Sequence, residues 1–275
     1  MSSAIPALEN YKLTLLNNDL IGHISIIAQT MKKTFFSELN VLFDYIKLHQ
    51  SQLRCIILTS ECKHFCTGLD LVEASSTLNG DSEDVGRQGI FIQRLIKQWQ
   101  NDLMNFFKIE IPVIVGIDNL CIGGGVDLIS FCDIRVCTEN AKFTIKEVDI
   151  GMCADIGSAQ RLPMLIKNDG KLRELFYTGR FFDSKEAQEL GLISNIYKNK
   201  EEMFKKMVEL ATTISEKSPV AVWTIKNVLN HQQQQDFEQN LRYMQAINSS
   251  MIQTTDMKVA IMSFLQKQKP DFPKL

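Results

Sequence analysis

Short apolar runs alternate with amphipathic segments through the first two-thirds of the chain. Residues 22–27, 55–59, 112–117 and 134–137 are apolar and rich in β-branched side chains, which predicts four strands. Between the first two, residues 35–48 predict a helix, because apolar side chains recur there every three or four positions. This alternation of strands and helices predicts a layered α/β architecture.

The last quarter of the chain has a helical pattern throughout. Helices are predicted over residues 201–217, 219–230, 236–252 and 256–268. The four glutamines at 232–235 predict an exposed joint between the second and third of these helices. The chain is therefore expected to end in a purely α-helical region.

Composition and charge indicate a globular domain with no general attraction to polyanions. The chain has 275 residues, a hydrophobic content of 45% and a net charge of −2, which predicts no nucleic-acid partner. No apolar run approaches the roughly 20 residues that span a bilayer, so no membrane partner is expected. Residues 1–10 lack a basic start followed by an apolar core, so no secretory signal is expected.

Two features of the sequence predict the cellular compartment of the protein. Seven cysteines, an odd number, lie mostly among apolar residues, which predicts reduced, buried thiols inside a cell. The chain ends in Pro273-Lys274-Leu275, which resembles a relaxed form of the small-basic-Leu signal for peroxisomal import, although three residues also match by chance. The peroxisome is the predicted location, with the mitochondrion or the cytoplasm as alternatives.

Three carboxylates follow a glycine-dense turn in an otherwise apolar region. Asp127 ends the run that begins with Gly123, and Glu147 and Asp155 come shortly afterwards. Glycines let a backbone present its N–H groups to a ligand, and carboxylates in apolar surroundings acquire shifted pKa values. Backbone donors beside proton carriers are what a carbonyl compound needs in order to lose an α-proton and persist as an enolate.

A second glycine turn precedes the first in the chain. Gly68 follows the strand predicted at 55–59, and Asp70 then opens an amphipathic segment, which alone predicts only a loop leading into a helix cap. Together with residues 123–125, however, this turn can contribute one of two backbone N–H groups to a shared oxygen. The polar residues 75–89 predict a mobile loop beside it.

The glycine and carboxylate motifs together resemble the crotonase (enoyl-CoA hydratase/isomerase) superfamily. The similarity covers roughly residues 21–272 and is most specific over residues 121–163. Gly-Gly-Gly-Val-Asp at 123–127, Lys-Glu-Val-Asp at 146–149 and Ala-Asp-Ile-Gly at 154–157 are similar to its Δ3,5-Δ2,4-dienoyl-CoA isomerase branch. The resemblance implies an acyl-CoA substrate.

The resemblance also implies an architecture. Residues 1–199 would form a crotonase-like spiral of ββα repeats that carries the acyl-CoA site. Residues 200–275 would form an α-helical region that assembles trimers, often paired as hexamers. No metal or redox cofactor is expected, because the CoA thioester is itself the substrate. Cys62, His64 and Cys66 have the spacing of half a metal site, but no second ligand pair follows.

Position by position, the resemblance implies roles for five residues. The N–H groups of Leu69 and Gly124 would form an oxyanion hole for the thioester oxygen. Glu147 and Asp155 would be the pair that moves protons, with Asp127 as a supporting carboxylate. Isomerising a 3,5-diene to a 2,4-diene removes a proton from C2 and returns one at C6, so a base and an acid are both needed. Asp155 is predicted to be the C2 base and Glu147 the C6 acid.

Other activities within the superfamily depend on the same residues. A hydratase needs two glutamates, at positions 127 and 147, to hold a water molecule, whereas position 127 is an aspartate here. A Δ3-Δ2-enoyl-CoA isomerase can work with the carboxylate at 147 alone. A non-catalytic binding protein with this fold would not need the three carboxylates. In that case Asp127 would cap a helix, and Glu147 would be a surface strand residue.

Some positions depart from the family pattern. Residues 119–120 are Asn-Leu where relatives usually have glycine or another small residue, so the turn before the glycine run is expected to differ. Lys32 and Lys33 stand near the place of a CoA-holding segment and are candidates for its phosphates. Phe264 and Lys267 match a C-terminal Phe and Lys that touch CoA in hydratases, although Phe264 also fits the core face of a helix.

Overall fold

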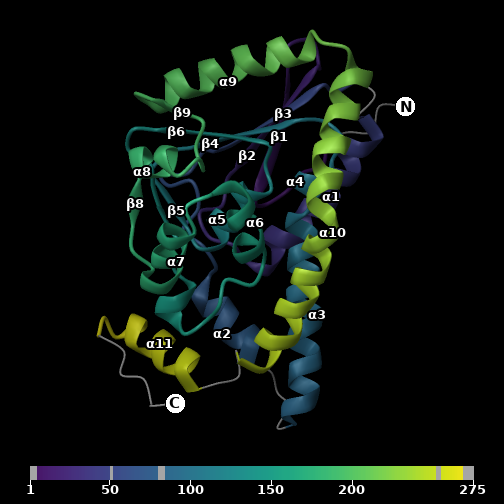
Figure 1. Cartoon of the computed structure of the whole chain (residues 1–275). Coiled ribbons are helices and arrows are strands. Elements are labelled where there is room, and N and C mark those ends of the chain that lie inside the picture. The colour runs from purple at the N-terminus through teal and green to yellow at the C-terminus, as the bar shows by residue number, and fades with distance from the viewer. Residues whose placement is uncertain (1–4, 50–51, 80–83, 252–254, 269–275) are drawn as a thin grey trace.

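Two β-sheets form the centre of the molecule (Figure 1). The computed structural model describes residues 5–49, 52–79, 84–251 and 255–268. The larger sheet has the order β1-β2-β3-β4-β6-β9, with strands β1 (Tyr11–Leu16), β2 (Ile21–Ile26), β3 (Cys55–Ser60), β4 (Val113–Ile117), β6 (Ile134–Thr138) and β9 (Asn195–Tyr197). The smaller sheet has the order β5-β7-β8, with strands β5 (Leu120–Ile122), β7 (Lys142–Thr144) and β8 (Phe182–Asp183).

Helices surround both sheets, and a short 3₁₀ helix, η1 (Glu147–Ile150), follows β7. The α-helices are α1 (Lys33–His49), α2 (Leu71–Asn79), α3 (Val85–Leu103), α4 (Asn105–Lys108), α5 (Gly124–Ser130), α6 (Ser158–Leu165), α7 (Asp169–Thr178), α8 (Ser184–Glu189), α9 (Lys200–Ser215), α10 (Pro219–Met251) and α11 (Thr255–Leu265). The predicted α/β architecture is confirmed.

The larger sheet is buried on both faces, which explains why its strands are continuous apolar runs. The strands β2, β3, β4, β6 and β9 pair in parallel, and all six residues of β3 are buried. On one face Met203 and Met207 of α9 pack against Ile57 and its neighbours. On the other face, Leu58 belongs to the main core together with α1 and α3.

Two predictions about connections were wrong. The expected joint at 232–235 lies within a single helix, α10, because glutamine is a good helix former and neither Gly nor Pro occurs after Pro219 in it. The expected loop at 75–89 is largely helical, since α2 continues to Asn79 and α3 begins at Val85. Residues 80–83 lie outside the described residues.

The predicted boundary between 199 and 200 falls between β9 and α9, and the division into two units stays a prediction. Beyond it, α10 runs along α3 (Figure 1). The last helix, α11, lies against η1. None of the helices in the described ranges combines the length and the apolar content that a bilayer-spanning segment needs.

Candidate active site

The loop after β3 hydrogen-bonds with Met31 on one side. The Met31 N–H donates to the Gly68 carbonyl at 2.9 Å, and the Asp70 N–H donates to the Met31 carbonyl at 3.0 Å. In such a parallel bridge the residue between these two partners, Leu69, directs its own N–H away from Met31. Gly68 has φ 84°, and a Cβ there would lie 3.1 Å from the Ile122 carbonyl oxygen. The loop therefore needs glycine at this position.

The other side of the loop is joined to β5. The Cys66 N–H donates to the Leu120 carbonyl at 3.1 Å, and the Ile122 N–H donates to the Cys66 carbonyl at 2.9 Å. These bonds bring the loop beside the start of α5. Neither the Leu69 N–H nor the Gly124 N–H donates in any turn, loop or side-chain hydrogen bond of the described chain. Two unused donors thus border the same region.

Gly123 lets a carboxylate approach the start of α5. Its φ is 51°, and a Cβ added there would lie only 2.8 Å from Glu147 Oε1. The Gly123 N–H donates to the Thr144 carbonyl at 2.9 Å, which connects the glycine run to β7 just before Glu147. A side chain at Gly123 would therefore displace Glu147 from the residue that precedes α5.

Asp127 connects two helices. It is fully buried in the first turn of α5, and its Oδ1 accepts a hydrogen bond from the Ser158 N–H at the start of α6. Its Oδ2 is buried without a hydrogen-bond partner. Burial raises the pKa of Asp127 to about 6, although the Ser158 N–H acts in the opposite direction. The alternative that Asp127 caps its own helix was wrong, because the carboxylate binds the N-terminus of α6 instead.

Glu147 is the first residue of η1, so the alternative of a surface strand residue was wrong. The residue is partly exposed, but its Oε2 is buried and has no hydrogen-bond partner. Burial first, and then the nearby charges of Asp127 and Asp155, raise the pKa of Glu147 to about 8. Glu147 is therefore largely protonated at neutral pH.

Asp155 precedes α6 in a segment without regular secondary structure and is 6% exposed. Its carbonyl accepts a hydrogen bond from Gln100 Nε2 of α3 at 2.6 Å. Gly157, two residues later, has φ 152°, and a Cβ there would lie 2.5 Å from the Phe131 ring. Because only glycine fits this conformation, the backbone around Asp155 is closely constrained. The fold thus brings together all three carboxylates that the sequence predicted.

The CoA candidates lie on elements that border the site. Lys32 and Lys33 are exposed and directly follow Met31, which is hydrogen-bonded to the loop after β3. Phe264 is 63% exposed, so the alternative that it faces the core was wrong. Lys267 is also exposed and lies just after α11, the helix that packs against η1. Contact of these four residues with CoA stays a prediction.

The expected departure at residues 119–120 falls in a turn that Asn119 shapes, and whether this turn differs from that of the relatives stays a prediction. Asn119 has φ 57°, a left-handed conformation that asparagine tolerates better than most residues. Its side-chain Nδ2 donates to the Lys63 carbonyl, and its own carbonyl accepts from the Lys142 N–H, both at 3.0 Å. Asparagine thus adopts the left-handed conformation here and ties the turn to Lys63 and Lys142.

Asp133 and Arg135 have partners within the fold. Lys226 forms a buried ion pair with Asp133 at 2.8 Å, and Arg135 donates to the carbonyls of Cys132 and Leu192. The seven cysteines are unpaired. Within the described ranges, no group of three or more His, Cys, Asp or Glu side chains is arranged to hold a metal ion.

Sequence reasoning missed Gln100, which contacts the Asp155 backbone. A signal was present, because Gln100 follows Ile96 by four positions and so lies on the apolar stripe of its helix. A glutamine on such a stripe is expected to have a buried hydrogen-bond partner. The sequence alone does not identify that partner.

Comparisons with known proteins agree with this geometry. The profile of the enoyl-CoA hydratase/isomerase family matches residues 27–274. The chain is 41% identical over 222 residues to the peroxisomal Δ3,5-Δ2,4-dienoyl-CoA isomerase of Arabidopsis thaliana, covering 80% of both chains. It is 38% identical over 239 residues to the mitochondrial Δ3,5-Δ2,4-dienoyl-CoA isomerase of Rattus norvegicus, covering 86% of this chain and 73% of the relative.

A solved structure is similar over almost the whole chain. The enoyl-CoA hydratase/isomerase of Pseudoalteromonas atlantica T6c superposes with a TM-score of 0.82 and is 18% identical in sequence. The match covers 96% of this chain and 100% of that one. At this level of identity the likeness shows the fold alone, and that fold is the one the motifs predicted.

Proposed function

The chain belongs to the enoyl-CoA hydratase/isomerase family, and from this premise we propose that it converts 3,5-dienoyl-CoA thioesters into 2,4-dienoyl-CoA thioesters. The observation that carries the proposal is the cluster of Asp127, Glu147 and Asp155 beside the unused N–H groups of Leu69 and Gly124. Relatives named for this reaction, at 38% and 41% identity, support it.

The reaction uses the backbone donors and two carboxylates in sequence. The thioester oxygen accepts hydrogen bonds from the Leu69 and Gly124 N–H groups, and Asp155 removes a proton from C2. The electron pair of the broken C–H bond shifts along the chain, so that C2=C3 and C4=C5 double bonds replace C3=C4 and C5=C6. Glu147 then gives its proton to C6. Loss of one oxyanion donor typically costs about 3–4 kcal/mol of barrier.

The protonation states suit these roles. Burial and neighbouring anions raise the pKa of Glu147 to about 8, so the group holds a proton that it can donate at neutral pH. Asp127 supports this state because its charge is one of the causes of the raised pKa. The proposed reaction needs no metal or redox cofactor, since the protein and the thioester supply every group that takes part.

Hydration is the runner-up reaction and is less well supported. A hydratase would hold a water molecule between carboxylates at positions 127 and 147. Asp127 is one methylene shorter than glutamate, and one of its oxygens already binds the Ser158 N–H. A purely binding role leaves the buried, unpaired oxygens of Asp127 and Glu147 without an explanation.

The proposal is tested by mixing the purified protein with a 3,5-dienoyl-CoA. Conjugation of the 2,4-diene with the thioester gives the product a distinct ultraviolet absorbance, which should rise with enzyme concentration. Liquid chromatography of the product distinguishes a dienoyl-CoA from a hydroxyacyl-CoA. No absorbance change, or a hydroxyacyl product, would show that the isomerase proposal is wrong.

The rate should fall at alkaline pH. If Glu147 is the acid, it must be protonated, and kcat should decline as pH rises through about 8, the pKa to which burial raises this group. The measurement is kcat at saturating substrate from about pH 6 to about pH 10. A rate that stays constant to the alkaline end of this range would remove Glu147 from the role of acid.

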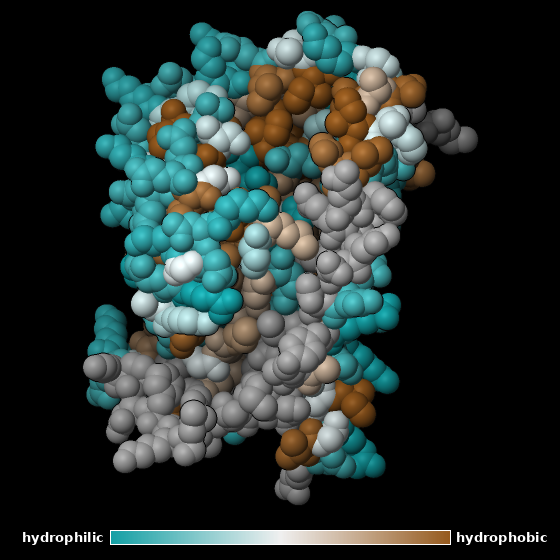
Figure 2. All heavy atoms as spheres, viewed as in Figure 1, coloured by the Kyte–Doolittle hydropathy of each residue, from teal (hydrophilic) through white to brown (hydrophobic). Residues whose placement is uncertain are grey.

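We further propose that copies of this chain associate through the start of α10. Over residues 219–229 the one buried residue is Lys226, whereas Trp223, Ile225 and Leu229 are exposed. Figure 2 shows apolar side chains gathered where α9 meets α10. A helix that is apolar on its outward side is normally covered, and a second copy of the helical region supplies a matching apolar surface.

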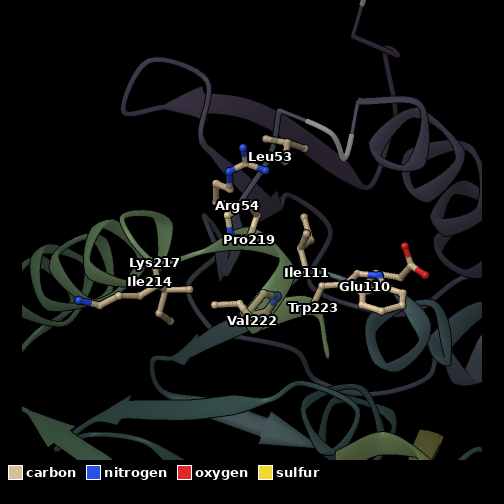
Figure 3. Close-up of a pocket in the computed structure, with 10 residues that line it drawn as sticks. Leu53, Arg54, Glu110, Ile111, Ile214, Lys217, Pro219, Val222 and Trp223 are labelled. Atoms are coloured by element: carbon tan, nitrogen blue, oxygen red, sulfur yellow. The ribbon is translucent and has the colours of Figure 1, made fainter. Parts of the chain in front are cut away.

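A pocket of about 240 Å³ lies at the same place (Figure 3). Its floor includes Ile111 and Val222, and Lys217 and Glu110 extend from opposite sides. Charges of both signs around an apolar centre fit the rim of an interface between identical chains.

The double variant Ile225→Asp/Leu229→Asp should therefore dissociate the assembly. Light scattering is expected to give a mass of several chains for the wild type and of one chain for the variant. Val41→Asp, which changes an exposed apolar residue on α1, is the control and should leave the mass unchanged. A monomeric wild type would refute this interface.

The relatives differ in their cellular compartment. The Arabidopsis protein is peroxisomal, and the rat protein is mitochondrial. We propose the peroxisome for this chain because of Pro273-Lys274-Leu275, which lies outside the described residues. Deleting Leu275 from a fluorescent fusion should abolish peroxisomal import. Unchanged localisation after the deletion would contradict the proposal.

A further inference from the structure

A chain of buried amides connects the C-terminal half of α10 to Asp155. Gln245 Nε2 of α10 donates to Gln100 Oε1 of α3 at 2.5 Å, and Gln100 Nε2 donates to the Asp155 carbonyl at 2.6 Å. Gln100 is 1% exposed and Gln245 is 7% exposed. Three segments far apart in the sequence thus share one buried hydrogen-bonded path.

Both ends of the Gln100 amide are engaged, so its orientation is fixed. The acceptor oxygen binds Gln245, which leaves the nitrogen facing the Asp155 backbone. The nitrogen donates to the main-chain carbonyl rather than to the carboxylate. This matters because a donor on the carboxylate would stabilise its charged form and weaken it as a base. Gln100 therefore holds the main chain of Asp155 and does not itself donate to the carboxylate.

The far end of the path is itself anchored. Along α10, Lys226 Nζ donates to Asp133 and to the Ile111 carbonyl, both at 2.8 Å. Asn230 Nδ2 donates to the Phe107 carbonyl at 2.9 Å. These contacts fix the register of α10 on the core, and the register in turn places Gln245 opposite Gln100.

We propose that Gln100, held by Gln245, is a positioning residue that sets the place of the Asp155 base relative to C2 of the substrate. The inference rests on the proposed isomerase function. The two hydrogen bonds of the Gln100 amide join Gln245 and the Asp155 main chain, so its loss should affect the chemical step more than substrate binding.

The test compares Gln100→Met, Gln245→Met and the double variant in the isomerase assay. Methionine keeps the length of the side chain and removes the amide. Gln100→Met should lower kcat by about 10- to 100-fold and change KM by less than about 3-fold, because small displacements of a reacting group are costly. Gln245→Met should have a smaller effect, and the double variant should match Gln100→Met because Gln245 acts through Gln100.

Gln88→Met is the matched control, since Gln88 is a buried glutamine of the same helix, 7% exposed. It should keep wild-type kcat even if the melting temperature falls. Additive effects in the double variant, equal losses in Gln88→Met, or wild-type kcat in Gln100→Met would overturn the proposal.

Two further readouts keep the test decisive. If Gln100→Met does not fold, Gln245→Met alone must still lower kcat at unchanged KM, and wild-type kcat in that variant overturns the proposal. Wild-type enzyme is assayed in parallel. An inactive wild type would defeat the proposed function, whereas an active wild type with unaffected variants would defeat only this inference.

Discussion

Glu147→Gln is expected to lower kcat by about 10²- to 10⁴-fold, the usual contribution of a general acid. Glutamine has nearly the shape of protonated glutamate, so the buried site should keep its geometry while losing the proton given to C6. KM should change little, because the backbone donors that hold the thioester oxygen are unaffected. The measurement is the initial rate of 2,4-dienoyl-CoA formation at saturating substrate.

Glu139→Gln provides the control for this variant. Glu139 is exposed at the end of β6, so its replacement should leave kcat unchanged. A Glu147→Gln enzyme as fast as the wild type would exclude Glu147 as the acid.

The same variant should alter the pH dependence of stability. The folded-state pKa of Glu147 is raised to about 8 from an ordinary value of 4.5, so the folded protein holds a proton that the unfolded chain has lost between these values. This contribution to stability is present below pH 4.5 and is lost as pH rises through about 8. Urea unfolding should therefore show Glu147→Gln gaining free energy of unfolding, relative to the wild type, as pH rises over this range.

Asp155→Asn should be the second severe variant, again with a loss of about 10²- to 10⁴-fold in kcat. An amide cannot accept the C2 proton, so the dienolate should not form. Isomerisation and proton exchange together separate proton removal at C2 from proton return at C6. Asp155→Asn should lose isomerisation and should also fail to exchange the C2 protons of the substrate with solvent. Glu147→Gln should retain that exchange, since only the return of a proton at C6 depends on the acid.

The control for Asp155→Asn is Asp44→Asn on α1. The Asp44 side chain is 74% exposed and forms a surface ion pair with Lys47, a type of pair that contributes little. Its replacement should leave both isomerisation and exchange intact. Retention of C2 exchange in Asp155→Asn would contradict the assignment of the base.

Most of the fold and the central residues of the candidate site can be predicted from the sequence. The apolar runs that became β2, β3, β4 and β6 are visible because both faces of a parallel sheet are buried, which leaves no polar alternation. The glycine run and the three carboxylates were recognisable because their chemistry limits which residues can occupy those positions. The positive φ values of Gly68 and Gly123 give the physical reason for those glycines.

Two of the misses have different causes. The polar stretch at 232–235 belongs to one continuous helix because glutamine is a good helix former, a local property that the prediction of a joint overlooked. The contact from Gln100 to Asp155 joins residues 55 positions apart. Such contacts depend on how one helix is placed against another, and no local pattern encodes that placement.

The most direct test of the account is proton NMR of the product formed from a 3,5-dienoyl-CoA in heavy water. Transfer of hydrogen from C2 to C6 through two separate carboxylates predicts a 2,4-dienoyl-CoA that carries deuterium at C6, because Glu147 exchanges with solvent between turnovers. Recovery of unchanged substrate, or a product with oxygen from solvent added at C3, would contradict it.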